Sequence, residues 1–174
     1  MNKFIKLPLF LGSVCLVFCA TLSVVVNICQ PVIDYNNRMK QLDGYTKLYD
    51  GVNKDLINDK IEIGEAYDRI NTIALVPYTG GESYVYTLTT KDPMSGSLQF
   101  MLGLDKETGV IDAYYLLNNN NAGYATYFEN NEKVLKDLED NKVTASKQTL
   151  TAGVVQGAID QALSHYDANL KGGK

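Results

Sequence analysis

Cysteine is scarce in this chain and confined to one end of it. The 174 residues include three cysteines, Cys15, Cys19 and Cys29, which lie inside or just after a long apolar segment. The remaining sequence has none, which excludes an intradomain disulfide, an all-cysteine zinc site and a cysteine-ligated iron–sulfur cluster there. We interpret the three as small apolar residues of a helix, with acylation or pairing to a neighbouring subunit as the alternative.

Histidine is rarer still, because His165 is the only one in the sequence. With one histidine, no cysteine outside the apolar segment and no spaced carboxylate pair, neither a hydrolytic triad nor a metal-assisted site can be assembled. His165 lies near the end of a predicted helix, where a cation is favourable, so we expect it to be structural. An enzyme of unknown class remains an alternative, which turnover of a substrate by the purified domain would support.

Proline and glycine are also few, at 4 and 14 residues. The chain is 45% hydrophobic and 21% charged, so it is not compositionally disordered and can fill the core of one domain. The net charge is −4; without Lys3 and Lys6, 14 basic side chains stand against 20 acidic ones. Such an acidic domain repels phosphate backbones, and nucleic-acid binding is not expected.

Ionisable residues are absent from residues 7–28. At ~1.5 Å per residue, a helix over this segment is roughly 33 Å long, enough to cross a bilayer core of about 30 Å. Lys3 and Lys6 precede it, while Asp34 is the first charge after it, so the positive-inside rule places the N-terminus in the cytoplasm. A cleaved signal peptide is the alternative, but its apolar region is normally about 7–15 residues long and ends in a small-x-small site. We expect an uncleaved single-pass anchor with the following domain outside the membrane.

The rest of the chain divides into a stalk and one domain. Residues 1–6 are expected in the cytoplasm, residues 29–64 as a stalk and connecting region whose helix breaks near Gly51, residues 65–170 as the domain and residues 171–174 as a tail. Strands are expected over four short segments, the second of which is rich in β-branched and aromatic residues. They are residues 70–77, 83–91, 96–105 and 109–117.

The last two of these strands are expected to form a hairpin across the turn at residues 105–109. Alternation places four apolar residues of the third strand on one face, namely Leu98, Phe100, Leu102 and Leu104. Residues 118–124 are rich in asparagine and predict an irregular turn. Amphipathic helices are expected over residues 131–139 and 149–169. The predicted fold class is α+β, an antiparallel sheet packed with helices and preceded by a transmembrane helix and a stalk.

Three pieces of the outer sequence occur in an order known from one family. The first is the strand pair at residues 84–86 and 101–111. The second is the loop at residues 120–125, where the family has Glu-Thr-Pro-Gly-Leu-Gly. The third is residues 146–151 before an amphipathic helix, where the family has Asp-x-x-Ser/Thr-Gly-Ala-Thr. Over roughly residues 7–167, the chain resembles the FMN-binding subunits of Rnf and Nqr electron-transport complexes, known as RnfG and NqrC.

The resemblance implies an FMN-binding type of domain with a covalent cofactor. In the family, a flavin transferase joins the FMN phosphate to the last threonine of the third motif through a phosphoester, and the matching residue is Thr149. A helix start suits a phosphate because it offers unpaired backbone N–H groups and the positive end of the helix dipole. The other candidate cofactor-binding residues are Ser146 and Gly123, which match the family motifs, and their neighbours Leu150, Thr151 and Tyr124.

The same resemblance implies a function and a location. The chain would be an electron carrier at the outer face of a bacterial plasma membrane, within an Rnf-type ion-translocating oxidoreductase. Its partners would be other membrane subunits, including a second one that carries flavin. The cofactor would supply the redox chemistry, and the protein its position and electrostatics.

The third motif departs from the family pattern at three positions. Val143, Lys147 and Gln148 stand where the family has Asp, Gly and Ala. Lys147 can pair with a phosphate, but it is long where the family residue is small. The alternative is a flavin-less relative that serves as a membrane-tethered scaffold or interaction domain, in which Ser146 and Thr149 only cap the helix.

The twelve tyrosines leave two interpretations open. They can stack on an isoalloxazine ring, although strand tyrosines are more often half-buried packing residues. The residues concerned are Tyr84, Tyr86, Tyr114, Tyr115, Tyr124 and Tyr127.

Overall fold

The computed structural model describes residues 3–92, 96–119, 134, 136–138, 140 and 149–172; side chains are not described at residues 3–9, 91, 92, 96, 119 and 149–152. The chain forms two compact units, Met1–Gln41 and Leu42–Lys174. The helix α1, Lys3–Leu48, contributes its first part to one unit and its last residues to the other.

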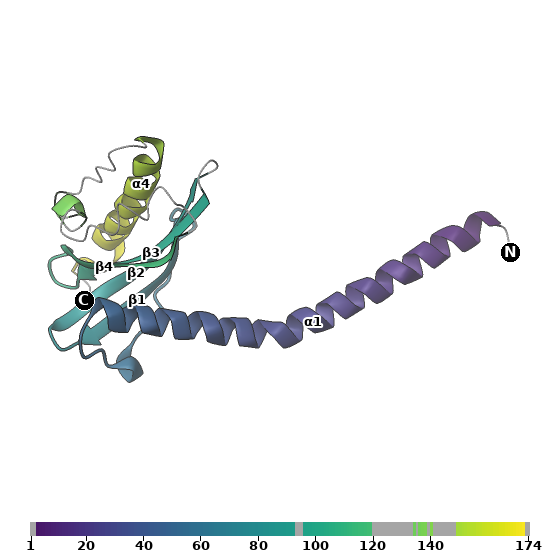
Figure 1. The fold of residues 1–174 in the computed structure, drawn as a ribbon, viewed down its shortest axis with the longest axis horizontal. Helices are drawn as coiled ribbons and strands as arrows, with labels where there is room; N and C mark the ends of the chain where they lie inside the picture. The colour runs from purple at the N-terminus through teal and green to yellow at the C-terminus, as the bar shows by residue number, and fades with distance from the viewer. Residues whose placement is uncertain are drawn as a thin grey trace. The chain divides into compact units, whose positions relative to one another are not determined.

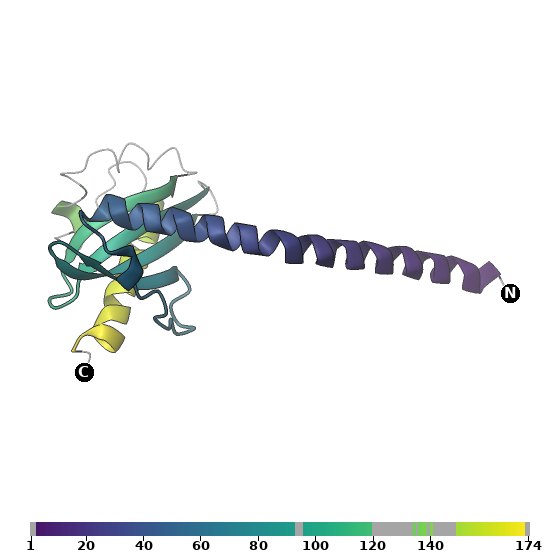
Figure 2. The same cartoon turned by 90° about the horizontal axis from the view of Figure 1, so that it is seen from below.

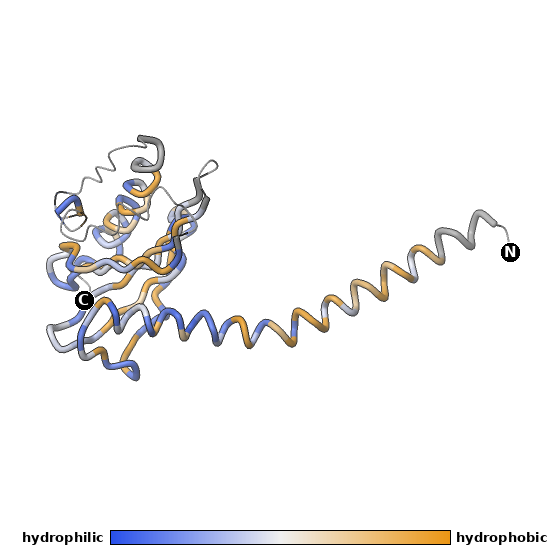
Figure 3. The backbone as a smooth tube through the Cα atoms, viewed as in Figure 1, coloured by the Kyte–Doolittle hydropathy of each residue, from blue (hydrophilic) through white to orange (hydrophobic). Residues whose placement is uncertain are grey.

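The first unit is the apolar part of α1 and the polar turns after it. In the part of the chain that the structure describes, α1 is the one helix long and apolar enough to cross a membrane. Figure 3 shows the change along the helix, from a hydrophobic stretch to mainly hydrophilic turns. Its large side chains, among them Phe10, Leu16 and Phe18, are exposed. The apolar segment expected to span the membrane therefore forms one continuous helix that is long enough to do so.

Hydroxyl groups within the apolar stretch bond to the helix itself. Ser13 Oγ donates to the Phe10 carbonyl at 2.8 Å, and the Thr21 hydroxyl donates to the Val17 carbonyl. A bilayer core offers no water to a free hydroxyl, so such bonds lower the cost of placing Ser and Thr there.

The second unit is built on a four-stranded antiparallel sheet with the order β1-β2-β3-β4 (Figure 1). The strands are β1, Ile70–Tyr78; β2, Gly81–Asp92; β3, Gly96–Asp105; and β4, Ile111–Asn119. Each strand pairs with the next one along the chain. The four expected strands, the hairpin of the last two and the α+β class are confirmed.

The turn between β3 and β4 explains why β4 begins two residues later than expected. Asp105 Oδ1 accepts bonds from the backbone N–H groups of Glu107 and Thr108, at 3.1 and 2.8 Å. It also accepts the Thr108 hydroxyl at 2.7 Å, and these Thr108 bonds lead the causes that lower the pKa of Asp105. Gly109 has a φ of 70°, which ends the turn and delays the strand.

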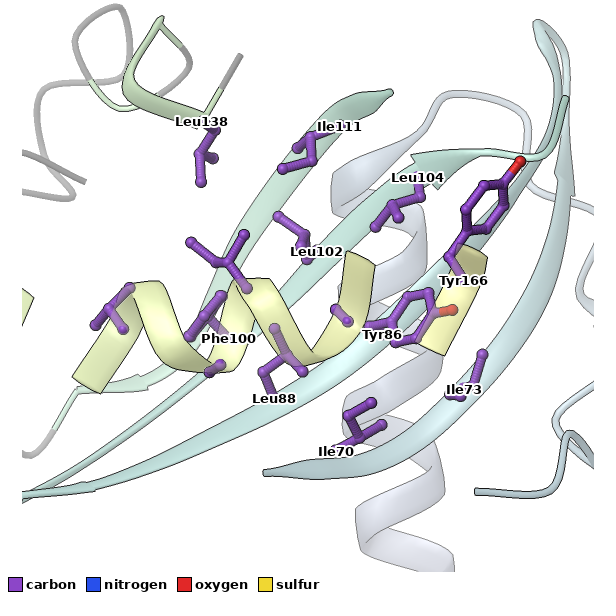
Figure 4. Close-up of a cluster of buried hydrophobic side chains, with 14 of the residues drawn as sticks. Ile70, Ile73, Tyr86, Leu88, Phe100, Leu102, Leu104, Ile111, Leu138 and Tyr166 are labelled. Carbon is purple, nitrogen blue, oxygen red and sulfur yellow. The ribbon is translucent and has the colours of Figure 1, made fainter. Parts of the chain in front are cut away.

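One face of the sheet packs against α4, Thr149–His165 (Figures 1 and 4). The four alternating residues of β3, Leu98 to Leu104, are each 1% exposed or less, as their pattern predicts. Burying such side chains contributes about 1.5–3 kcal/mol apiece. Val134 and residues 136–138 are helical, in agreement with the short helix expected there, and Val134 and Leu138 are buried in this same cluster.

The opposite face of the sheet packs against the end of α1 (Figure 2). Tyr45 and Tyr49 are 2% and 8% exposed and share a cluster with Val76, Val85 and Met101. Burial, with a smaller contribution from Asp59, raises the pKa of Tyr45 to about 12. The second unit therefore begins at Leu42, whereas the sequence assigned residues up to 64 to the stalk. The reason is that the last two turns of α1 carry the apolar cover for this face.

A polar network lies within this second cluster. The Tyr49 hydroxyl donates to Asp112 Oδ1, and Ser83 Oγ donates to Asp112 Oδ2 at 2.7 Å. The Tyr49 ring also stacks on Tyr78, with ring centroids 4.2 Å apart. A Cβ at Gly103 would lie 2.6 Å from Asp112 Oδ1 and closer still to the Tyr49 hydroxyl. Glycine at position 103 is what allows this hydroxyl to reach the strand.

We predict that Gly103→Ala destabilises the second unit by about 1–3 kcal/mol, because the added methyl group displaces the Tyr49 hydroxyl. The measurement is chemical denaturation of the full chain in detergent, followed by near-ultraviolet circular dichroism. The double variant Gly103→Ala with Tyr49→Phe removes the clashing oxygen. The double variant should lose less unfolding free energy than the two single variants lose together. Strictly additive losses would contradict this account.

Candidate functional site

The candidate site is the start of α4, which begins at Thr149 as expected. After His165 the chain continues in a π-helical turn, Tyr166–Leu170, where the sequence predicted helix to residue 169. One face of α4 is buried against the sheet. The buried residues of this face are Val155, Ala158, Ile159 and Ala162, and Tyr166 of the π-helical turn continues it. The predicted apolar stripe is thus the buried face of this helix.

The first turn of α4 has the properties of an anion-binding helix start. It contains no acidic residue, so no carboxylate competes with a phosphate there. The first four backbone N–H groups of an α-helix have no partner within the helix, and they lie at the positive end of its dipole. Thr149, Leu150 and Thr151 lie together in this turn. This donor set fits the phosphate of an FMN on Thr149.

Space is available along the helix face that begins at position 149. Gly153 is one turn further along on the same face, and it is exposed. A Cβ built at Gly153 would meet no atom within 4 Å. The described side chains therefore leave the helix surface next to the first turn open.

The Arg69 side chain packs against α4 about two turns after the helix begins. Its Nη1 donates to the Val154 carbonyl at 3.0 Å and occupies the space that a Cβ at Gly157 would need. The Arg69 backbone N–H donates to Gln161 Oε1 at 3.1 Å, and Gln161 Nε2 donates to Asp68 Oδ1 at 2.9 Å. These hydrogen bonds hold the chain just before β1 against a partly buried side of α4.

The structure brings together only part of the site expected from the sequence. Thr149, Leu150 and Thr151 share the first turn of α4. Ser146, Gly123 and Tyr124 lie outside the described residues. Sequence reasoning missed Arg69, and its one signal was Gly157, a glycine inside an otherwise regular amphipathic helix.

The described tyrosines of the strands serve packing. Tyr86 is fully buried, and Tyr84 packs edge-on against Tyr166 at 6.1 Å between ring centroids. Tyr114 is half-buried against the same cluster. Tyr115 belongs to the other face of the sheet, where its hydroxyl accepts a bond from Lys47 Nζ at 3.0 Å. Tyr124 and Tyr127 lie outside the described residues.

His165 ends α4, as the sequence indicated, but it is buried at 1% exposure. Its Nδ1 lies 3.1 Å from the Tyr86 hydroxyl, and the Tyr67 ring packs edge-on at 4.9 Å. Burial lowers the pKa of His165, opposed by a hydrogen bond with the backbone of Glu62. The imidazole is therefore neutral near pH 7, not the cation that a helix end would favour, because desolvation outweighs the dipole.

We predict that His165 makes the second unit less stable in mild acid. The unfolded chain protonates this histidine near pH 6.5, while the folded chain resists protonation to a lower pH, so stability falls as pH drops from about 7 through 6.5. His165→Gln should remove this part of the slope. The measurement is the denaturation midpoint of both proteins at pH 5.5, 6.5 and 7.5, and parallel pH curves would contradict the prediction.

Within the described residues there is no group of three or more His, Cys, Asp or Glu that could hold a metal ion. Comparison of the chain with family models, with curated proteins and with solved structures gives no match.

Proposed function

We propose that this chain is a membrane-anchored electron carrier with FMN attached to Thr149 through a phosphoester, a subunit of an Rnf-type ion-translocating oxidoreductase. The observation that carries the proposal is that Thr149 is the first residue of α4, in a first turn free of acidic residues. A hydroxyl at that place can form the ester while the helix N–H groups hold the phosphate oxygens.

The chain's own residues would divide the work between them. Thr149 would hold the phosphate, Leu150 and Thr151 would supply backbone N–H groups of the same turn, and Gly153 would leave room beside it. FMN, when bound, supplies the electron transfer. A covalent bond would prevent loss of a soluble cofactor outside the cell. Modification would require a flavin transferase, and electrons would come from and pass to other membrane subunits.

The anchor supports the proposed location. Residues 7–28 would cross the bacterial plasma membrane within α1, with Lys3 and Lys6 on the cytoplasmic side. The domain would then stand outside, where a redox centre can exchange electrons with other membrane subunits.

A second candidate is favoured by the motif itself. Lys147 and Gln148 are long side chains directly before Thr149, at positions where the family has small residues. If these residues keep the transferase away, the chain is a flavin-less scaffold or interaction domain tethered by the same helix.

The flavin prediction is tested on the protein from its native host. The denatured band should fluoresce under ultraviolet light, and the intact mass should exceed that of the chain by one esterified FMN. Thr149→Val should abolish both signals, because no oxygen remains for the ester. Thr151→Val is the matched control, since it changes the same residue type in the same turn and should keep the flavin.

A dark band with the mass of the unmodified chain, from cells that contain an active flavin transferase, would overturn the carrier proposal. It would leave the scaffold as the remaining candidate. A mass increment that survives Thr149→Val would place the ester on another residue.

The orientation is tested on intact spheroplasts of the native host. Added protease should digest residues 42–174, because they lie outside, while a cytoplasmic marker stays intact. Alkaline carbonate should leave the full chain in the membrane pellet, because α1 spans the bilayer. Protection of the domain until the membrane is lysed would contradict the orientation.

A further inference from the structure

Arg69 carries a positive charge beside α4 that forms no ion pair with a carboxylate among the described residues. Ion pairs within the described part of the chain join Lys47 to Asp43, Lys106 to Glu82 and Lys171 to Asp167. Arg69 belongs to none of them, and the neighbouring Asp68 carboxylate accepts a bond from Gln161 instead. A guanidinium has five N–H donors, and the bond to the Val154 carbonyl uses one.

The position of this guanidinium is fixed rather than free. Its Nη1 rests on the helix at Gly157, where any side chain would displace it. Its backbone is held to Gln161 one turn further along. The charge is therefore presented at a defined place on α4, which is what a preorganised electrostatic contact requires.

That place lies within reach of a ligand attached to Thr149. Val154 and Gly157 come five and eight residues after Thr149, which is about 7.5 and 12 Å along a helix axis. Gly153 lies between them and the helix start, exposed and with open space at its Cβ. A ribityl phosphate that left Thr149 along this face would bring the attached ring within reach of Arg69.

We propose that Arg69 is a positioning residue for the flavin ring, with its guanidinium set against the pyrimidine edge, at the N1 and C2 carbonyl positions. This inference rests on the proposed function. Uptake of two electrons and one proton leaves the ring with one more negative charge than before. A fixed cation at that edge stabilises this charge and raises the reduction potential. The role of Arg69 is electrostatic, because a guanidinium supplies charge and not a proton to the ring.

A purely structural role of Arg69 would have a different effect on the flavin potential. If Arg69 only joins the chain before β1 to α4, its loss lowers stability and leaves the flavin potential unchanged. If it faces the ring, loss of charge lowers the potential, and a change that keeps the charge largely preserves it. The two roles are therefore separated by the potential, not by the stability.

The experiment uses the full chain carrying FMN, purified in detergent from cells that contain the flavin transferase. The variants are Arg69→Gln, Arg69→Lys and, as the control, Lys171→Gln, which removes one exposed cation at the other end of the helix. Potentiometric titration with dithionite and redox dyes is carried out from pH 6 to 9. Thermal unfolding of each variant is measured alongside.

Arg69→Gln should change the ratio of reduced to oxidised flavin at fixed potential at least tenfold, which is about 30 mV for a two-electron couple. It should also raise the pH at which reduction changes from taking up two protons to one, because the cation favours the anionic reduced ring. Arg69→Lys should recover most of the shift, and Lys171→Gln should show none.

Equal potentials in wild type and Arg69→Gln, with flavin present in both, would overturn the role of Arg69 alone. A wild-type chain that carries no flavin in these cells would overturn the proposed function, and this inference with it. A shift of the same size in Lys171→Gln would show a general charge effect and would also overturn the role of Arg69.

Discussion

The constraint on which the domain depends is that its sheet has two apolar faces, and each requires its own cover. Along β3, even-numbered residues such as Phe100 and Leu102 face α4, while Met101 belongs to the cluster beneath the end of α1. Side chains of a strand alternate between faces, so a single strand contributes to both cores. A helix on one side alone would leave the other face in water. This is why the last turns of α1 belong to the domain.

That second cover makes the end of α1, from Leu42 onward, and the sheet parts of one compact unit. Tyr45 and Tyr49 come from the helix that begins near the N-terminus, yet they are buried on the sheet. The bonds from Tyr49 and Ser83 to Asp112 satisfy the polar groups that accompany this packing. Burial, followed by the bond to Asp112, raises the pKa of Tyr49, so the phenol stays protonated and able to donate.

Sequence patterns predicted the parts of this fold that depend on neighbours along the chain. The alternation from Leu98 to Leu104, the turn at Asp105 and the stripe of α4 are all local, and each was found where expected. The packing of Tyr49 on Gly103 joins residues 54 positions apart. A polar stalk pattern carries no signal for such a contact, and the compact unit consequently began earlier than predicted.

The candidate site likewise has one part that local sequence predicts and one part that depends on contacts between distant residues. Thr149 at a helix start follows from a local motif and an apolar period. Arg69 reaches Val154 across 85 residues, and only the glycine at 157 marks its place in the sequence. The neutral state of His165 was equally hidden, because a helix end favours charge while burial, a property of the whole fold, removes it.

The strand order has a consequence for how the domain is made. Since every strand pairs with its predecessor, the sheet grows without waiting for any later segment, and its contacts are short in sequence. The helix α4, which covers the face opposite the end of α1, is synthesised last. A chain synthesised from its N-terminal end can therefore pair all four strands while Phe100 and Leu102 are still exposed to water. This face of the sheet is covered only when the segment that begins at Thr149 has been made. The residue proposed to receive the cofactor thus belongs to the final step of folding.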